Sequence, residues 1–191
     1  MSASRNRSRP EERFVDFLVE LVENEDRASL AALRRGLGKK PGEAAESHPL
    51  ILPRIPANAS RWDEDAYYLA GSLFALHQID WPASEDEDQR TNLGASFARL
   101  GRVVESESIE KRFVALLNCH EDDLPDHLRH AVSLLKSKEI PIDWARLLRD
   151  VRRWNNEDRW VQREWARAFW GNAREQAQQT GSTQDNNQSA D

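Results

Sequence analysis

The stretch from Ile140 to Trp170 reads IPIDWARLLRDVRRWNNEDRWVQREWARAFW and contains five of the seven tryptophans of the chain. Apolar residues recur at helical spacing in two parts of it, Trp144 to Val151 and Trp160 to Phe169, and Asn155 and Asn156 separate the two parts. Asp143 can cap the first of these helices. Because each aromatic side chain can bury on the order of 150–250 Å², we expect this helical hairpin to anchor the hydrophobic core.

The composition favours an all-α fold. The chain has 191 residues, 31% of them charged, and only eight glycines, and most of the sequence continues in helical periods. We predict two small helical bundles packed end to end, residues 10–104 and 105–171, with a soft boundary near residues 101–108. The basic, serine-rich residues 1–9 are predicted to be a disordered arm, and the glutamine-rich residues 172–191 a disordered tail.

The segments before the hairpin carry their own helix signals. Ser60 with Asp63 is a capping pattern, and Thr91 can cap a helix that contains Gly94. A glycine inside a helix is a candidate for close backbone approach to a neighbouring helix. Residues 41–59 contain four prolines and no helical period, so they are predicted to form a long irregular connection.

No residue pattern indicates catalysis or a metal centre. Cys119, His120, His127 and His130 are close in sequence, but no second pair has the spacing of a structural zinc site. We therefore expect a small buried cysteine, histidines at the surface or at helix caps, and a satisfied core histidine at His77. Convergent carboxylates, a glycine-rich phosphate loop and a nucleophile with a base are absent at recognised spacings. We predict no cofactor, no metal, no catalytic residue and no small-molecule substrate.

The charge distribution is more informative than the net charge of −6, which by itself argues against a nucleic-acid partner. Residues 27–40 carry several basic groups with no acidic residue among them, and residues 129–153 hold seven basic groups against three acidic ones. Offsets of three and seven residues place Arg146, Arg149 and Arg153 on one side of a helix. Such a row suits contact with backbone phosphates, because charge alone gives affinity for any sequence.

Four blocks of the sequence, in order, resemble the CasB family, the small subunit of the type I-E CRISPR surveillance complex called Cascade. The resemblance spans roughly residues 11–171 and is carried by Leu33-Arg34-Arg35-Gly36, the run NLGASFARL at residues 92–100, Arg112-Phe113 with Leu116-Leu117, and Ile142-Asp143-Trp144, Leu147-Leu148, Asp150, Trp154, Trp165-Ala166-Arg167 and Phe169-Trp170. Single blocks are common in helical proteins, whereas four in this order are fairly specific.

The resemblance implies a non-catalytic subunit, two copies of which would line the complex beside the guide RNA and bind the displaced non-target DNA strand. The implied partners are other Cascade subunits, a second copy of the chain, guide RNA and single-stranded DNA. The predicted nucleic-acid-binding residues are Arg27, Arg34, Arg35, Lys39, Arg99, Arg102, Arg112, Arg129, Arg146, Arg149 and Arg153.

Two alternatives to this function remain. A helical scaffold could touch only protein, and a small metal-dependent nuclease would need divalent-ion-dependent cleavage, which no residue pattern supports. No apolar run approaches 18 residues, so no membrane span is expected. The single Cys119 fits a reducing compartment, and we predict a cytoplasmic protein.

Overall fold

A computed structural model describes residues 9–81, 91–104 and 106–171. Its main helices are α1 (Pro10–Glu23), α2 (Arg27–Arg34), α3 (His48–Ile51), α4 (Arg61–Leu76), α5 (Leu93–Val103), α6 (Glu107–Asn118), α7 (Leu124–Lys136) and α8 (Trp144–Arg152). A further helix covers residues 160–171, and short 3-10 turns lie at Ala45–Ser47, Leu52–Arg54 and Glu121–Asp123. Over these ranges the one β-type pairing is an isolated bridge between Asp80 and Ile142. The predicted all-α fold is confirmed.

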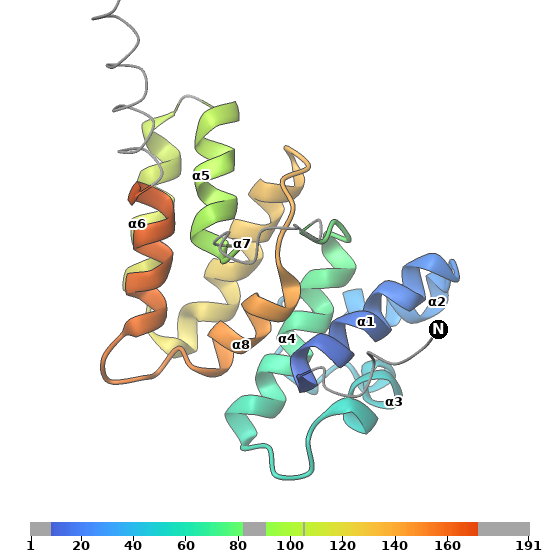
Figure 1. Ribbon diagram of the computed structural model, residues 1–191. Coiled ribbons are helices and arrows are strands. Elements are labelled where there is room, and N and C mark those ends of the chain that lie inside the picture. The colour runs from blue at the N-terminus through green and yellow to red at the C-terminus, as the bar shows by residue number, and fades with distance from the viewer. Residues whose placement is uncertain (1–8, 82–90, 105, 172–191) are drawn as a thin grey trace, which may run out of the picture.

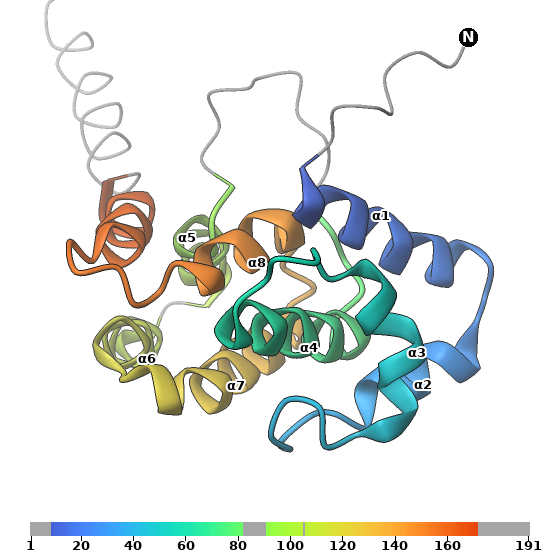
Figure 2. The same ribbon diagram turned by 90° about the horizontal axis from the view of Figure 1, so that it is seen from below.

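The helices form two groups joined by one core (Figure 1). Helices α1 to α4 lie on one side, and α5, α6 and helix 160–171 lie on the other. Helix α8 packs against α4 and α1, and α7 packs against α4 and α6, so both cross the middle of the molecule (Figure 2). A single hydrophobic cluster runs through both groups. The boundary between two bundles near residues 101–108 stays a prediction. Expression of residues 10–104 alone would test it, because an independent bundle should fold without the rest of the chain.

The tryptophan hairpin anchors the core, as predicted, through Trp144, Trp154 and Trp165, whereas Trp160 and Trp170 are partly exposed. The Asp143 carboxylate accepts a hydrogen bond from the backbone N–H of Arg146 at 2.8 Å and caps α8. Trp144 and Trp165 are at most 1% exposed. The Trp165 indole N–H donates to Asp150 Oδ2 at 2.7 Å, which joins the two arms of the hairpin through a buried carboxylate.

Gly94 allows α5 to lie directly against helix 160–171. A Cβ atom built on Gly94 would meet the backbone of Trp165, so the predicted close approach is confirmed. The predicted cap at Thr91 is wrong. Asn92 accepts from the Ala95 N–H at 3.2 Å and begins α5 instead. The Thr91 hydroxyl donates to the carboxylate of Asp143.

The prediction of an irregular connection over residues 41–59 is wrong in part, because this stretch contains α3 and two 3-10 turns. Pro49 and Pro53 occupy first turns, where a helix needs no backbone N–H from them. Four-residue helices are too short to produce a visible apolar period, yet Ile51 is fully buried in the core. Burial of one side chain orders a segment that periodicity alone could not identify.

The ends of the chain are described only in part. The predicted arm is described at Arg9 alone, and residues 1–8 and the predicted tail, residues 172–191, lie outside the described residues. Among the helices that are described, none combines the length and the apolar character needed to cross a membrane.

Candidate nucleic-acid interface

The row of arginines predicted on α8 lines one surface groove. Arg146, Arg149 and Arg153 share it with residues from the start of α1 and from helix 160–171. We call this surface the α8 groove and define it by its lining residues, Arg9, Pro10, Glu11, Arg146, Arg149, Arg152, Arg153 and Trp160. The first turn of α1 lies beside α8 in Figure 2, so the two walls of the groove come from opposite ends of the chain.

Arg146 is held by a buried acid. Its Nε donates to Asp150 Oδ1 at 2.9 Å, and its side chain is 24% exposed while that of Asp150 is fully buried. Burial raises the pKa of Asp150, whereas Arg146 and the Trp165 N–H favour the charged form. Much of the Arg146 charge is therefore balanced inside the protein, and this residue supports the groove more than it offers free charge to a ligand.

Arg152 fastens α8 to two other helices. Its guanidinium donates to Asp63 of α4 at 2.6 Å and also to Glu11 of α1, and it lies over the ring of Tyr67. Burial alone would raise the pKa of Asp63, but the contacts with Arg152 and the hydrogen bonds from Ser60 outweigh it, so the pKa is lowered. The sequence prediction did not include Arg152, and its charge is neutralised by the two carboxylates.

Arg149, Arg153 and Arg9 supply the unbalanced charge of the α8 groove. Within the described parts of the chain, no carboxylate lies within ion-pair distance of these three guanidinium groups. Burial lowers the pKa of Arg149, and the positive charges of Arg146 and Arg9 lower it further, while the carboxylates of Asp150 and Asp143 oppose this shift in part. An anion in the groove would relieve this repulsion, so the geometry favours a ligand with phosphate-like charge.

Two other predicted residues have structural contacts of their own. Arg34 donates through Nε and Nη2 to the carbonyl of Ala75, at 3.0 and 2.8 Å, and so caps the C-terminal end of α4. Arg99 stacks on Trp81, with its Cζ atom 3.8 Å from the ring centroid. Burial lowers the pKa of Arg99, and the charge of Arg102, one turn along α5, adds to this.

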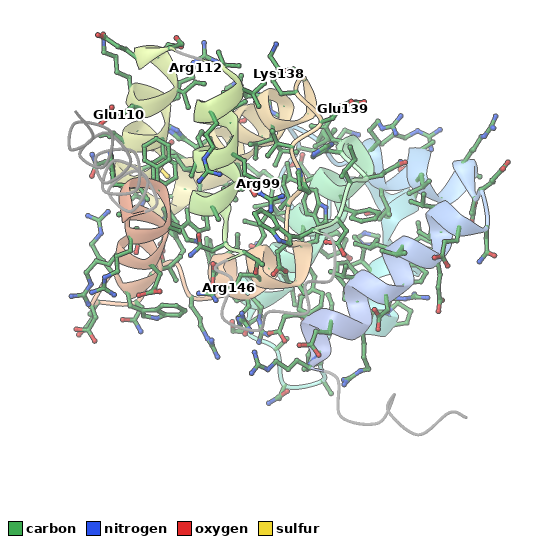
Figure 3. The ribbon with its side chains drawn as sticks, turned by 45° about the horizontal axis from the view of Figure 1, so that its top comes forward. Arg99, Glu110, Arg112, Lys138, Glu139 and Arg146 are labelled. Carbon is green, nitrogen blue, oxygen red and sulfur yellow. The ribbon has the colours of Figure 1, made fainter. Side chains whose placement is uncertain are left out.

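The remaining predicted residues are distributed over the surface. Arg27 and Arg35 are exposed and lie 3.8 Å from Glu25 and 3.9 Å from Glu46, and Arg102 is exposed at the end of α5. Lys39 and Arg129 line a second cavity, where Arg129 pairs with Asp126 at 3.3 Å. Arg112 lines an apolar cavity with His127 and His130. In the view of Figure 3, Arg99 lies between Arg112 and Arg146.

The structure thus brings together the α8 row, and separately the pair Lys39 and Arg129, but it does not place all eleven residues around one groove. Whether each binds nucleic acid stays a prediction. Sequence reasoning missed Arg9 and Trp160, because nothing along the chain indicates that residue 9 meets residue 149. A count of arginines at three-residue offsets on α8 would have added Arg152 to the row.

His77, His120 and Cys119 have structural surroundings, in the core or at the ends of helices. His77 is buried, and its Nε2 lies 2.6 Å from the Ile140 carbonyl, so the predicted core histidine is confirmed. Cys119 is half-buried, less than predicted. Burial lowers the pKa of His77 and raises the pKa of the Cys119 thiol to about 11. His120 Nδ1 accepts from the Asp122 N–H at 3.4 Å, as a cap. In the described ranges, no three His, Cys, Asp or Glu side chains gather closely enough to hold a metal ion.

These features describe an all-α protein with an arginine-lined groove between its first helix and its C-terminal hairpin. The family model described as CRISPR-associated protein Cse2 matches residues 29–170. The chain belongs to the Cse2 family, and the resemblance inferred from the four sequence blocks is confirmed.

Three relatives illustrate the similarity. A CRISPR-associated protein Cse2 of Thermus thermophilus is 37% identical over 164 residues, which cover 85% of this chain and 90% of the relative. The crystal structure of M. ruber CasB is 33% identical with a TM-score of 0.76, and the match covers 90% of this chain and 98% of that chain. A chain of a CRISPR RNA-guided surveillance complex is 29% identical with a TM-score of 0.76, over 90% and 97% of the two chains.

Proposed function

We propose that this chain is a non-catalytic subunit of a CRISPR RNA-guided surveillance complex of the type I-E Cascade kind, and that it stabilises the displaced non-target DNA strand. Membership of the Cse2 family and the similarity to a chain of such a complex support the assembly. The observation that carries the nucleic-acid role is the α8 groove, where Arg9, Arg149 and Arg153 gather without a carboxylate partner among the described residues.

The mechanism is electrostatic. Guanidinium groups contact backbone phosphates and release the condensed counterions, which gives affinity for any sequence. The guide RNA reads the target by base pairing, so this subunit needs only to hold the strand that pairing displaces. The partners are the other subunits, a second copy of the chain, guide RNA and single-stranded DNA, in the cytoplasm, and no bond is made or broken by this chain.

Within this role the arginines of the α8 groove differ. Arg149 and Arg153 are the principal phosphate ligands, because Arg146 and Arg152 are already paired with buried or half-buried carboxylates. Arg102 and Arg112 are exposed on α5 and α6 and do not line the α8 groove, so they are secondary candidates for phosphate contact. Arg34 is a poor test position, because replacing it would also remove the cap of α4.

The direct test is protection of the non-target strand in the assembled complex. The double variant Arg149→Glu with Arg153→Glu should lose protection, while target-strand pairing continues. The matched control is Lys111→Glu, a charge reversal at an exposed residue of α6 outside the groove. If the double variant is incorporated and protection is unchanged, the α8 groove does not hold the strand.

Salt dependence distinguishes this role from that of a scaffold that touches only protein. The logarithm of the single-strand binding constant should fall with the logarithm of salt concentration, by about 0.7 in slope for each phosphate contact. Each of Arg149 and Arg153 should account for about one such step. A pure scaffold shows no binding to titrate. The apolar cavity between α5, α6 and α7, lined by Phe97, Leu116 and Leu134, favours protein contact as an additional role of the same subunit.

A further inference from the structure

Two tryptophans of the hairpin, Trp160 and Trp170, are partly exposed, and of these Trp160 lines the α8 groove. Trp144, Trp154 and Trp165 are buried, whereas Trp160 is partly exposed and lines the α8 groove beside the arginines. We propose that Trp160 is a stacking platform for a nucleobase, and that it makes the α8 groove selective for single strands over duplexes. This inference rests on the proposed function and names the form of nucleic acid that the groove takes.

Trp160 is partly exposed, and Arg153 lies farther from its ring than the arginine of another arginine–tryptophan pair of this chain lies from its tryptophan. Arg99 lies 3.8 Å from the centroid of Trp81, which is the distance of a closed stack, and the Trp81 indole nitrogen is buried. Arg153 lies 6.0 Å from the centroid of Trp160. Two stacked layers, each at the optimal carbon–carbon separation of about 3.5–4.0 Å, span about 7–8 Å. A small displacement of Arg153 would therefore admit a base between its guanidinium and the indole.

Packing and hydrogen bonds fix the position of Trp160 and of the residues beside it. The Trp160 side chain packs in part against the hydrophobic core. The turn before it is fixed by Arg159, whose Nη2 donates to the Leu117 carbonyl at 2.5 Å. The turn after it is fixed by Gln162, whose Nε2 donates to the Trp154 carbonyl at 3.0 Å. A ring ordered in advance loses little conformational freedom on binding, which favours affinity.

The partly exposed ring of Trp160, together with the guanidinium groups of Arg149 and Arg153, favours a single strand over a duplex. A single strand can place its phosphates on Arg149 and Arg153 while an unstacked base lies on the Trp160 ring, and stacking of this kind accepts every base. In a duplex the bases are already stacked on one another and their faces are closed. A duplex can therefore use only the charge of the α8 groove, and a single strand can use charge and stacking together.

The test compares two probes of equal length and charge on the full-length chain at low salt: a 20-nucleotide oligothymidine and a 20-nucleotide abasic strand. Trp160→Leu keeps an apolar side chain but removes the planar face, and should weaken oligothymidine binding by about 5- to 150-fold with no change for the abasic strand. Trp160→Phe should retain most of the affinity for oligothymidine. Trp170→Leu replaces an exposed tryptophan outside the groove and is the matched control.

The outcomes separate this inference from the proposed function. Arg149→Glu should weaken both probes alike, because both carry the phosphates. If Arg149→Glu acts on both probes and Trp160→Leu acts on neither, or on both equally, the stacking role is rejected and the phosphate role stands. If the unaltered chain binds neither probe, both proposals are overturned. Equal circular dichroism and melting temperature of Trp160→Leu and the unaltered chain show that the loss is not unfolding.

Discussion

Gly94 of α5 and Trp165 of helix 160–171 meet backbone to backbone: a Cβ atom at Gly94 would lie 2.0 Å from the Trp165 carbonyl oxygen. Neither backbone can move without shifting its helix. Gly94→Ala should therefore destabilise the protein by about 1–3 kcal/mol, the usual cost of forcing extra atoms into a packed interior. Urea denaturation of the variant gives the free energy of unfolding.

Gly101 provides the matched control, since it lies in the same helix and a Cβ atom added there would meet no described neighbour within 4 Å. Gly101→Ala should be neutral or stabilising by up to about 1 kcal/mol, because alanine has the higher helix propensity. Equal effects of the two substitutions would show that the contact between α5 and helix 160–171 is looser than described.

Trp144→Ala and Trp165→Ala should each cost roughly 3–5 kcal/mol, because both side chains are fully buried. Trp165→Phe measures the contribution of the indole hydrogen bond separately from that of the buried ring. It keeps an aromatic ring but leaves the buried Asp150 without the indole N–H, which should cost about 1–3 kcal/mol. Trp170→Ala, at an exposed position, is the comparison for all three. Near-neutral values for Trp144 and Trp165 would contradict their placement in the core.

Replacing Arg152 should loosen α8 from α1 and α4. Arg152→Met leaves Glu11 and Asp63, both largely buried, without their cation. Removing one partner of a fully buried pair costs about 3–5 kcal/mol, and the partial exposure of Arg152 reduces our expectation to about 2–3 kcal/mol. Arg167→Met breaks an exposed pair with Glu164 and should cost less than about 1 kcal/mol. Thermal unfolding of both variants measures the difference.

Tyr67 should make the fold sensitive to alkali. Its side chain is fully buried, its hydroxyl has no hydrogen-bond partner among the described residues, and burial raises its pKa from 10.0 to about 12. Because the folded pKa exceeds the unfolded one, this contribution to stability is complete below about pH 10 and is lost as the pH rises to about 12.

Tyr67→Phe should remove that dependence. The free energy of unfolding of the unaltered chain should fall by up to roughly 2–3 kcal/mol more than that of the variant between about pH 9 and 12. Other groups that titrate in this range, such as Cys119, are common to both proteins. Parallel curves would show that the Tyr67 hydroxyl reaches water.

The sequence allowed the fold and the core to be predicted more fully than the groove. Helices long enough to show an apolar period, and caps such as Asp143, follow from local rules. The glycine contact at Gly94 also followed, because a mid-helix glycine has few other uses. The short helix α3 could not be predicted, because four residues show no apolar period. Its buried side chain, Ile51, packs in the core.

The α8 row could be predicted because helical spacing places Arg146, Arg149 and Arg153 together. The sequence could not predict which of these arginines has a carboxylate partner, because the partners can be distant along the chain. The sequence predicts Arg34 as a nucleic-acid-binding residue, and in the structure its guanidinium caps the end of α4. Arg9 reaches the same groove as Arg149 only after α1 has packed against α8.

Because Arg9 and Trp160 are 151 positions apart (160 minus 9) in the chain, the α8 groove cannot form until residue 160 has been synthesised. At about 5–20 residues per second, roughly 8–30 seconds separate the synthesis of Arg9 from that of Trp160. Truncated translation products keep Arg9 but lack α8, so they cannot compete with the finished subunit for a displaced strand. The order of the helices along the chain therefore sets the time at which the chain becomes able to bind a displaced strand.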